Sequence, residues 1–137
     1  MKQVQLVAPG HIHVVWPTVR GLLNLAIINF DNADYDVEHL KVLLVRDIQK
    51  LFVVIEDSNI IGAFTVEIDN QPNYLIAHTT CMGGKGIFDI DTINQYEEWC
   101  KSQGITKIRA YAQDSQARLF KMKLGLEKVT NVVEKTL

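Results

Sequence analysis

The sequence contains little cysteine and no cysteine motif. Cys81 and Cys100 are the only cysteines among 137 residues, and neither a CxxC pair nor a Cys/His zinc spacing is present. We therefore expect two reduced, partly buried thiols, with a disulfide between them as the open alternative. His11 and His13 alternate with Ile12, but no third ligand accompanies them. No metal site is expected.

An excess of charge and long apolar runs are also missing. The formal net charge is −2 and the pI is about 6.0, whereas a protein that grips nucleic-acid phosphates usually has a basic excess. Apolar stretches such as 25–28 are too short to span a bilayer, and residues 1–6 read as a strand rather than a signal peptide. We expect a cytoplasmic protein with neither nucleic acid nor membrane as a partner.

The composition that remains is that of an ordinary globular chain. Hydrophobic residues make up 47% and charged residues 22% of the sequence, values typical of a folded domain with one core. No linker, repeat or low-complexity tract interrupts it. We expect a single domain over residues 1–137.

The spacing of apolar residues predicts an α/β (α+β) fold. The expected order is strand, helix, helix, three strands, helix, strand, helix and a closing strand. The strands are predicted at 4–8, 51–55, 60–68, 74–80, 105–112 and 129–133, and the helices at 15–30, 36–48, about 89–104 and 115–124. Pro17 is expected in a first helical turn, Asp36 at an N-cap and Ile48 on an inner helix face. This order implies a mixed, mostly antiparallel central sheet with helices on both faces.

Three glycines stand between the predicted strand 74–80 and the helix after it. Gly83, Gly84 and Gly86 would let the backbone approach a ligand closely, and amides at a helix N-terminus favour a phosphate. Lys85 adds a positive charge. The segment fits neither the P-loop nor the GxGxxG fingerprint. It predicts an anion site, with an ordinary loop as the alternative.

The string GGKGI, followed by a helix carrying YEEWCKSQGITKI, resembles the pyrophosphate-binding segment of the GNAT superfamily of N-acyltransferases. The string DSQARLFKMKLGL resembles that family's next motif, and the predicted element order matches over nearly the whole chain. The resemblance implies that acetyl-CoA lies between two splayed central strands and that its acetyl group passes directly to a primary amine. The coenzyme-binding residues that it implies are Thr80, Cys81, Met82, Gly83, Gly84, Lys85, Gly86, Ile87 and Asp114.

The sequence departs from the family pattern at two motif positions. Gly83 or Cys81 stands where the family has Arg or Gln, depending on which glycine is aligned, and both registers stay open. Asp89 and Asp91 stand near the helix start, where carboxylates either cap the helix or compete with a phosphate for its amides. Lys121 replaces the tyrosine that protonates the leaving thiolate. Its acidity, at a pKa of about 10.4 against about 10 for tyrosine, suits that role.

Amide formation also requires a base, because an attacking ammonium must lose a proton. His78 is the first candidate, since an imidazole titrates near neutrality, and Glu67 is the second; a core histidine is the alternative reading of His78. Asp31, Asp34 and Tyr35 stand where the family binds its acceptor, and carboxylates there would attract a cationic amine. A polyamine, an aminoglycoside or a protein lysine would suit them.

Two functions remain open from the sequence. The first is an N-acetyltransferase that uses acetyl-CoA. The second is a catalytically inactive GNAT-like binding or accessory protein, for example of phage or mobile-element origin. A homodimer is compatible with either. Gly84→Val or Gly86→Val should abolish coenzyme binding and leave the fold intact.

Overall fold

The computed structural model describes residues 2–28, 36–87, 89–110, 121, 125–127, 129 and 135–137. Within these ranges the strands are β1 (Gln3–Val7), β2 (Lys50–Glu56), β3 (Asn59–Asn70), β4 (Leu75–Gly84) and β5 (Lys107–Ala110). The helices are the 3-10 turn η1 (Pro9–His11), α1 (Ile12–Ile28), α2 (Val37–Val45) and α3 (Ile90–Ser102). The predicted helix 115–124 and closing strand 129–133 fall almost wholly outside the described residues.

The five strands form a mixed sheet in the order β1-β2-β3-β4-β5. The first three pairings are antiparallel, and β4 pairs with β5 in parallel. A parallel pair needs a crossover, and α3 supplies it between β4 and β5. The structure thus confirms the predicted mixed, mostly antiparallel sheet.

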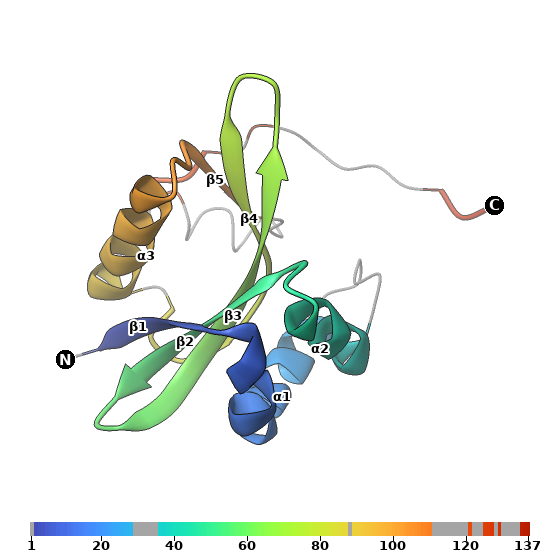
Figure 1. The fold of residues 1–137 in the computed structure, drawn as a ribbon, viewed down its shortest axis with the longest axis vertical. Coiled ribbons are helices and arrows are strands. Elements are labelled where there is room, and N and C mark those ends of the chain that lie inside the picture. Colours follow the sequence, from blue (N-terminus) through green and yellow to red (C-terminus); the bar gives the residue numbers. More distant parts are fainter. Residues whose placement is uncertain are drawn as a thin grey trace.

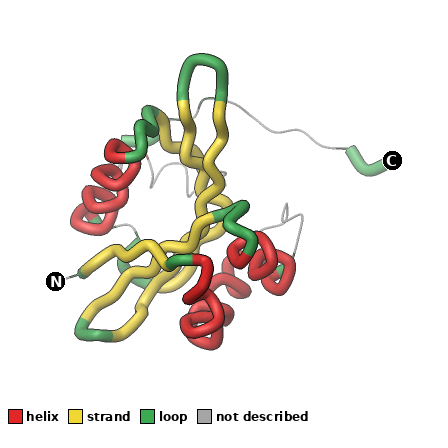
Figure 2. Tube along the Cα trace, in the orientation of Figure 1, coloured by secondary structure: helices red, strands yellow, loops and turns green. Residues whose placement is uncertain are grey.

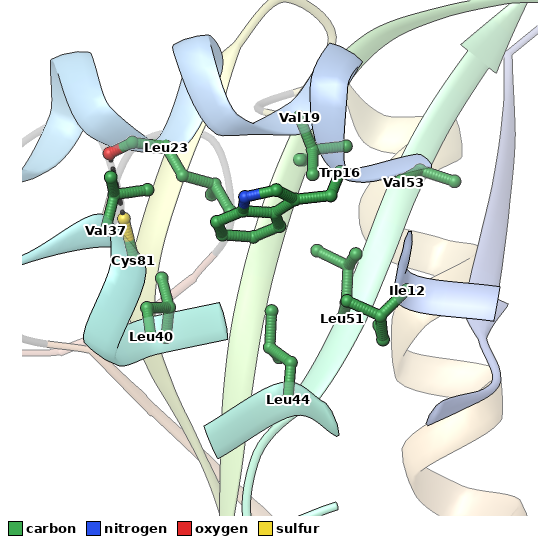
Figure 3. Packing of buried hydrophobic residues seen from close by; sticks show 11 residues of the cluster. Ile12, Trp16, Val19, Leu23, Val37, Leu40, Leu44, Leu51, Val53 and Cys81 are labelled. Carbon is green, nitrogen blue, oxygen red and sulfur yellow. Dashed lines mark hydrogen bonds between the residues drawn. The ribbon is translucent and has the colours of Figure 1, made fainter. Parts of the chain in front are cut away.

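Helices cover both faces of the sheet, as Figures 1 and 2 show. Helices α1 and α2 pack on one side, called here the α1–α2 face, and α3 packs on the other, the α3 face. Figure 3 shows Trp16 of α1 within the apolar cluster on the α1–α2 face. The buried members of this cluster are Ile12, Trp16, Val19, Leu23, Val37, Leu40, Leu44, Leu51, Val53, Ala63 and Cys81.

Aromatic rings dominate the core on the α3 face. Phe52 of β2 and Phe64 of β3 stack with their ring centroids 5.1 Å apart. Tyr96 and Trp99 of α3 meet the Phe52 ring edge-on, at centroid distances of 5.4 and 4.9 Å. Such offset and edge-to-face pairs stabilise beyond their buried area, so α3 is held firmly over the centre of the sheet.

Two helix boundaries differ from the prediction. Helix α1 begins at Ile12, so Pro17 lies inside the helix and not in its first turn. The early start follows from the apolar face, because Ile12 is buried at helical spacing from Trp16. Helix α2 ends at Val45, and Ile48 is 53% exposed instead of facing inward. The predicted N-cap of α2 is confirmed, since the Asp36 carboxylate accepts a hydrogen bond from the His39 amide.

Candidate active site

Strand β4 carries a β-bulge at Thr80. Along β3 and β4, Thr65 pairs with Cys81 while Val66 pairs with Thr79, so Thr80 is the extra residue. The described part of the ladder between β4 and β5 reaches the pair Thr79 and Ala110, next to the bulge. Strand β4 nevertheless continues to Gly84. Residues 81–84 continue the pairing with β3 beyond the bulge.

A hydrogen-bonded network anchors the bulge from the α1–α2 face. The Thr80 hydroxyl lies 2.7 Å from the Thr65 hydroxyl and 2.6 Å from Oε1 of Gln49. Because Gln49 Oε1 only accepts, Thr80 gives its one proton to Gln49 and accepts a hydrogen bond from Thr65. Thr65 is 0% and Gln49 is 4% exposed. The bulge is therefore held by a buried polar chain from the loop before β2 to β3.

The two predicted base candidates lie side by side next to this network. Glu67 of β3 pairs directly with His78 of β4, and His78 pairs with Arg109 of β5. Val66 and Ala77 belong to the core of the α3 face, so alternation places Glu67 and His78 on the α1–α2 face. Directly opposite side chains on one face have Cβ atoms about 5 Å apart. Three charged or titratable groups thus line up across β3, β4 and β5.

Burial lowers the pKa of His78 from its ordinary value. The carboxylates of Asp69 and Glu67 act in the opposite sense, and the Arg109 guanidinium adds to the lowering. A histidine whose pKa is lowered is neutral at physiological pH and has a lone pair to accept a proton. Arg109 was missed by the sequence reasoning, although its alternation with Ile108 in a predicted strand was a usable signal.

The glycines at the end of β4 serve close packing. A Cβ on Gly83 would lie 2.1 Å from the Leu22 carbonyl oxygen of α1, and one on Gly84 would lie 2.4 Å from the Ile61 carbonyl oxygen. Gly84 also has φ of +88°, which disfavours other residues. The expectation that β4 ends near Thr80 and that Gly84→Val spares the fold is therefore wrong. Neighbouring backbone requires these two glycines.

The turn after β4 leads into α3. The Lys85 amide donates to the Ile61 carbonyl at 2.8 Å, and Gly86 has φ of +81°. Helix α3 starts behind the N-cap Asp89, whose carboxylate makes no capping hydrogen bond and forms an ion pair with Lys2. This ion pair, with a second one to a glutamate of β2, raises the pKa of Lys2. The predicted phosphate turn thus has a carboxylate and an ammonium beside it.

The two thiols are reduced and lie on opposite faces of the sheet. Cys81 donates a hydrogen bond to the Leu23 carbonyl at 3.5 Å (Figure 3). Burial raises the pKa of Cys81 to about 12 and that of Cys100 to about 11. Thiols with such pKa values are not nucleophiles at neutral pH. The expected pair of free thiols is confirmed.

The remaining predicted site residues have mixed outcomes. Lys121 is exposed, and its part in the site stays a prediction. Asp31, Asp34, Tyr35 and Asp114 lie outside the described residues. None of the described helices has the length and apolarity needed to cross a bilayer. Over the same residues, no group of three or more His, Cys, Asp or Glu side chains is placed to hold a metal ion.

Neither a protein-family model nor a curated protein matches this sequence, but solved acetyltransferases match the structure. One is an aminoglycoside acetyltransferase from an uncultured soil metagenomic sample, in complex with sisomicin. It has 17% identity and a TM-score of 0.69, with 99% of this chain and 96% of that chain covered. Another is a possible acetyltransferase from Clostridium difficile 630, with 14% identity, a TM-score of 0.73, and 100% and 98% covered.

A third match was solved with acetyl-CoA. It is a predicted acetyltransferase from Clostridium acetobutylicum, with 16% identity, a TM-score of 0.65, and 99% of this chain and 96% of that chain covered. At such identities the likeness concerns the fold, and it extends over the full length of both chains. This chain therefore shares the fold of these acetyltransferases.

Proposed function

We propose that this protein is an N-acetyltransferase that moves an acetyl group from acetyl-CoA directly to a primary amine. The observation that carries the proposal is the β-bulge at Thr80 of β4, which lies two residues from a histidine with a lowered pKa. The shared fold supports it, as does the similar protein solved with acetyl-CoA.

The reaction follows from the groups on the α1–α2 face. An acceptor ammonium loses a proton to Nδ1 or Nε2 of His78, and the amine nitrogen then attacks the thioester carbon. The C–S bond breaks, the nitrogen loses its second proton to solvent as the amide forms, and the thiolate leaves. Glu67 stabilises the imidazolium that this proton transfer creates. Lys121 is the residue that we propose for the departing sulfur. It either donates a proton to the thiolate or stabilises the thiolate by its positive charge.

The charge near His78 favours a cationic acceptor. Glu67 and Asp69 place two carboxylates on the same strand and face, and such groups attract an amine. Asp31, Asp34 and Tyr35 are the further acceptor-binding residues that we propose. The similar protein in complex with sisomicin supports an aminoglycoside; a polyamine and a protein lysine have the same charge chemistry.

One observation favours the second candidate, an inactive binding or accessory protein. Asp89 and Asp91 place two carboxylates at the start of α3, where the pyrophosphate of acetyl-CoA would bind. The ion pair of Asp89 with Lys2 neutralises one of them. If the remaining charge excludes the coenzyme, the fold is retained without the reaction.

The test is amine-dependent release of CoA thiol from acetyl-CoA, with spermidine, sisomicin and a lysine peptide as acceptors. We expect release with at least one amine, and loss of release in His78→Gln or Glu67→Gln. The variant with the larger loss identifies the base. His13→Gln, an exposed histidine on α1, is the matched control. Coenzyme binding without release from any amine would favour the inactive alternative.

A further inference from the structure

Charges of opposite sign stand on the two strands that flank His78. Glu67 of β3 and Arg109 of β5 each pair with His78, from opposite sides of β4, and these strands are neighbours in the sheet (Figure 1). Ile108 belongs to the core of the α3 face, so alternation places Arg109 on the α1–α2 face. An acid, an imidazole and a base therefore form one row across that face.

The acid and the base of this row are kept apart. The ion pairs that the described residues form with one another involve neither Glu67 nor Arg109, and two strand spacings of about 9.5 Å in total separate their backbones. Burial is the main cause of the lowered pKa of His78, and the Arg109 guanidinium adds to the lowering. The carboxylates of Asp69 and Glu67 act in the opposite sense. The histidine therefore lies in the field of both signs of charge.

The second basic residue of β5 is engaged with an aromatic ring. The Lys107 ammonium lies 3.9 Å from the centre of the Tyr74 ring, a cation–π contact. Lys107 pairs with Ile76, which precedes His78 by two residues on β4. Among the described residues of β5, Arg109 is therefore the one that presents a positive charge directly beside the histidine.

A row of this kind matches an acceptor that carries both charges. Glu67 is half-buried, so its partly desolvated carboxylate gains from a cationic partner. A polyamine or an aminoglycoside bound there would bring further ammonium groups toward the Arg109 guanidinium, and like charges repel. An amino acid brings a carboxylate to that position instead.

The separation of the two charged side chains limits the length of the acceptor. Side chains stand roughly perpendicular to a sheet, so the strand spacing also approximates the distance between the charged groups. With a charge-assisted hydrogen bond of about 2.8 Å at each end, roughly 4 Å remains for the acceptor itself. One or two carbon atoms between an amino group and a carboxylate suit this length.

We propose that the acceptor is a zwitterionic α- or β-amino acid, whose ammonium lies at Glu67 and whose carboxylate is held by Arg109. This inference rests on the proposed function, since it specifies the amine. The guanidinium binds the carboxylate with two parallel hydrogen bonds and so orients the amino group toward His78. The product is the N-acetylated amino acid, which keeps its carboxylate. Arg109 determines specificity and takes no part in the proton transfer.

The experiment compares β-alanine, and each protein amino acid that has a primary amino group, with the amine that lacks only its carboxylate. Thiol release from acetyl-CoA at about pH 8.5, above the ordinary pKa of histidine, gives kcat/KM for both members of each pair. We expect at least one amino acid to exceed its matched amine by about tenfold to a hundredfold, the effect of one hydrogen bond between charged groups. This comparison uses the wild-type protein and requires no variant.

Substitutions of Arg109 test the assignment of the carboxylate. Arg109→Gln should remove the preference for the amino acid and leave kcat/KM for the matched amine unchanged. Arg109→Lys should recover part of the preference, because an ammonium keeps the charge but not the two parallel hydrogen bonds. Arg109→Glu should reverse the preference, so that 1,3-diaminopropane becomes a better acceptor than β-alanine. Lys107→Gln removes a positive charge from the same strand and face, is the matched control, and should leave the preference unchanged.

The outcomes separate this inference from the proposed function. Equal kcat/KM for every amino acid and its matched amine would overturn the inference, and so would a preference that persists in Arg109→Gln. In both cases the proposed function stands, because an amine is still acetylated. Absence of thiol release with every acceptor, spermidine and sisomicin included, would overturn both.

Discussion

The two faces of β4 differ in chemistry, although one strand supplies both. On the α1–α2 face, His78 lies between Glu67 and Arg109, next to the buried chain from Thr65 to Gln49. On the α3 face, Met82 and Thr79 meet an aromatic core. The bulge at Thr80 marks the boundary between the two arrangements, because the extra residue reverses the alternation of side chains in the part of β4 that follows it.

The bulge alters the alternation of side chains between the two faces of the sheet, and this affects the candidate site. His78 and Cys81 are three residues apart, yet both face the α1–α2 side, since the bulge lies between them. An unbroken strand would turn one of them to the other face. Strand β4 can therefore carry polar groups around His78 and, directly after the bulge, residues such as Cys81 that pack against helix α1. Substitutions on either side of the bulge should show whether the two stretches of β4 have these separate roles.

Gly84→Val should prevent folding. Its Cβ would lie 2.4 Å from the Ile61 carbonyl oxygen, at a φ of +88°, and the atoms that it meets are backbone atoms of Ile61 and Gly62, which no side-chain movement relieves. We expect insoluble or unfolded protein, measured by circular dichroism and soluble yield. Gly21→Ala, with open space inside α1, should stabilise by about 0.5–1 kcal/mol. A folded Gly84→Val protein would refute the packing role of this glycine.

His78→Gln should lower the rate of transfer by about 10²–10⁴, the range for loss of a general base. The fold and the affinity for acetyl-CoA should stay unchanged, because His78 is only partly buried and glutamine is a polar side chain of similar size. Steady-state kinetics of thiol release measure the effect, which should fall on kcat and leave KM for acetyl-CoA unaltered. A rate within threefold of the wild type would remove His78 from the mechanism.

Thr80→Val should destabilise the protein by about 2–3 kcal/mol, because it removes the hydrogen bonds of the Thr80 hydroxyl with Gln49 and Thr65. Thr80→Ser keeps the hydroxyl and should recover most of that loss. Urea denaturation gives the two free energies of unfolding. Equal stability of the valine and serine variants would mean that the hydrogen-bonded chain does not hold the bulge.

The pH dependence should show the smallest effect. The pKa of His78 is lowered from about 6.5. The His78 imidazole should therefore stay neutral at pH 6.5, and the activity should fall only below that pH. Asp69→Asn removes a carboxylate that raises this pKa and should move the acid limb of the rate profile further down. Arg109→Gln should move it up. Shifts in the same direction for both variants would contradict the assignment.

The same lowered pKa links folding to pH. The unfolded chain binds a proton at His78 more readily than the folded chain, so stability rises with pH between the folded and unfolded pKa values. The protein should therefore lose stability as pH falls below about 6.5. In His78→Gln this part of the loss should be absent, which urea denaturation at several pH values can test.

Local patterns predicted much of this structure. The apolar periods gave the order of the described elements, Asp36 was recognisable as a cap, and Glu67 and His78 were chosen for their chemistry. The register that sets them face to face required pairing between strands, which single-strand alternation does not specify. The contacts of Gly83 and Gly84 with Leu22 and Ile61 are tertiary. Glycines that let the backbone approach a phosphate and glycines that let it approach a neighbouring strand or helix give the same sequence pattern.

Other features had no local signal. The bulge at Thr80 depends on how β4 meets β3, and its polar chain reaches Gln49, 31 residues away. The helical period placed Tyr96 inward, but the edge-on contacts of its ring with Phe52 and Phe64 depend on how α3 packs on the sheet. The bulge and the surroundings of Tyr96 depend on contacts between segments that are distant in the sequence. Composition and residue spacing do not specify such contacts.

The most direct test of the central claim is calorimetric titration of the protein with acetyl-CoA, with ATP as the control for a site that binds any nucleotide phosphate. The account predicts saturable binding of acetyl-CoA that ATP does not reproduce. Absence of binding at millimolar acetyl-CoA would contradict it, and would mean that this fold serves a purpose other than acyl transfer.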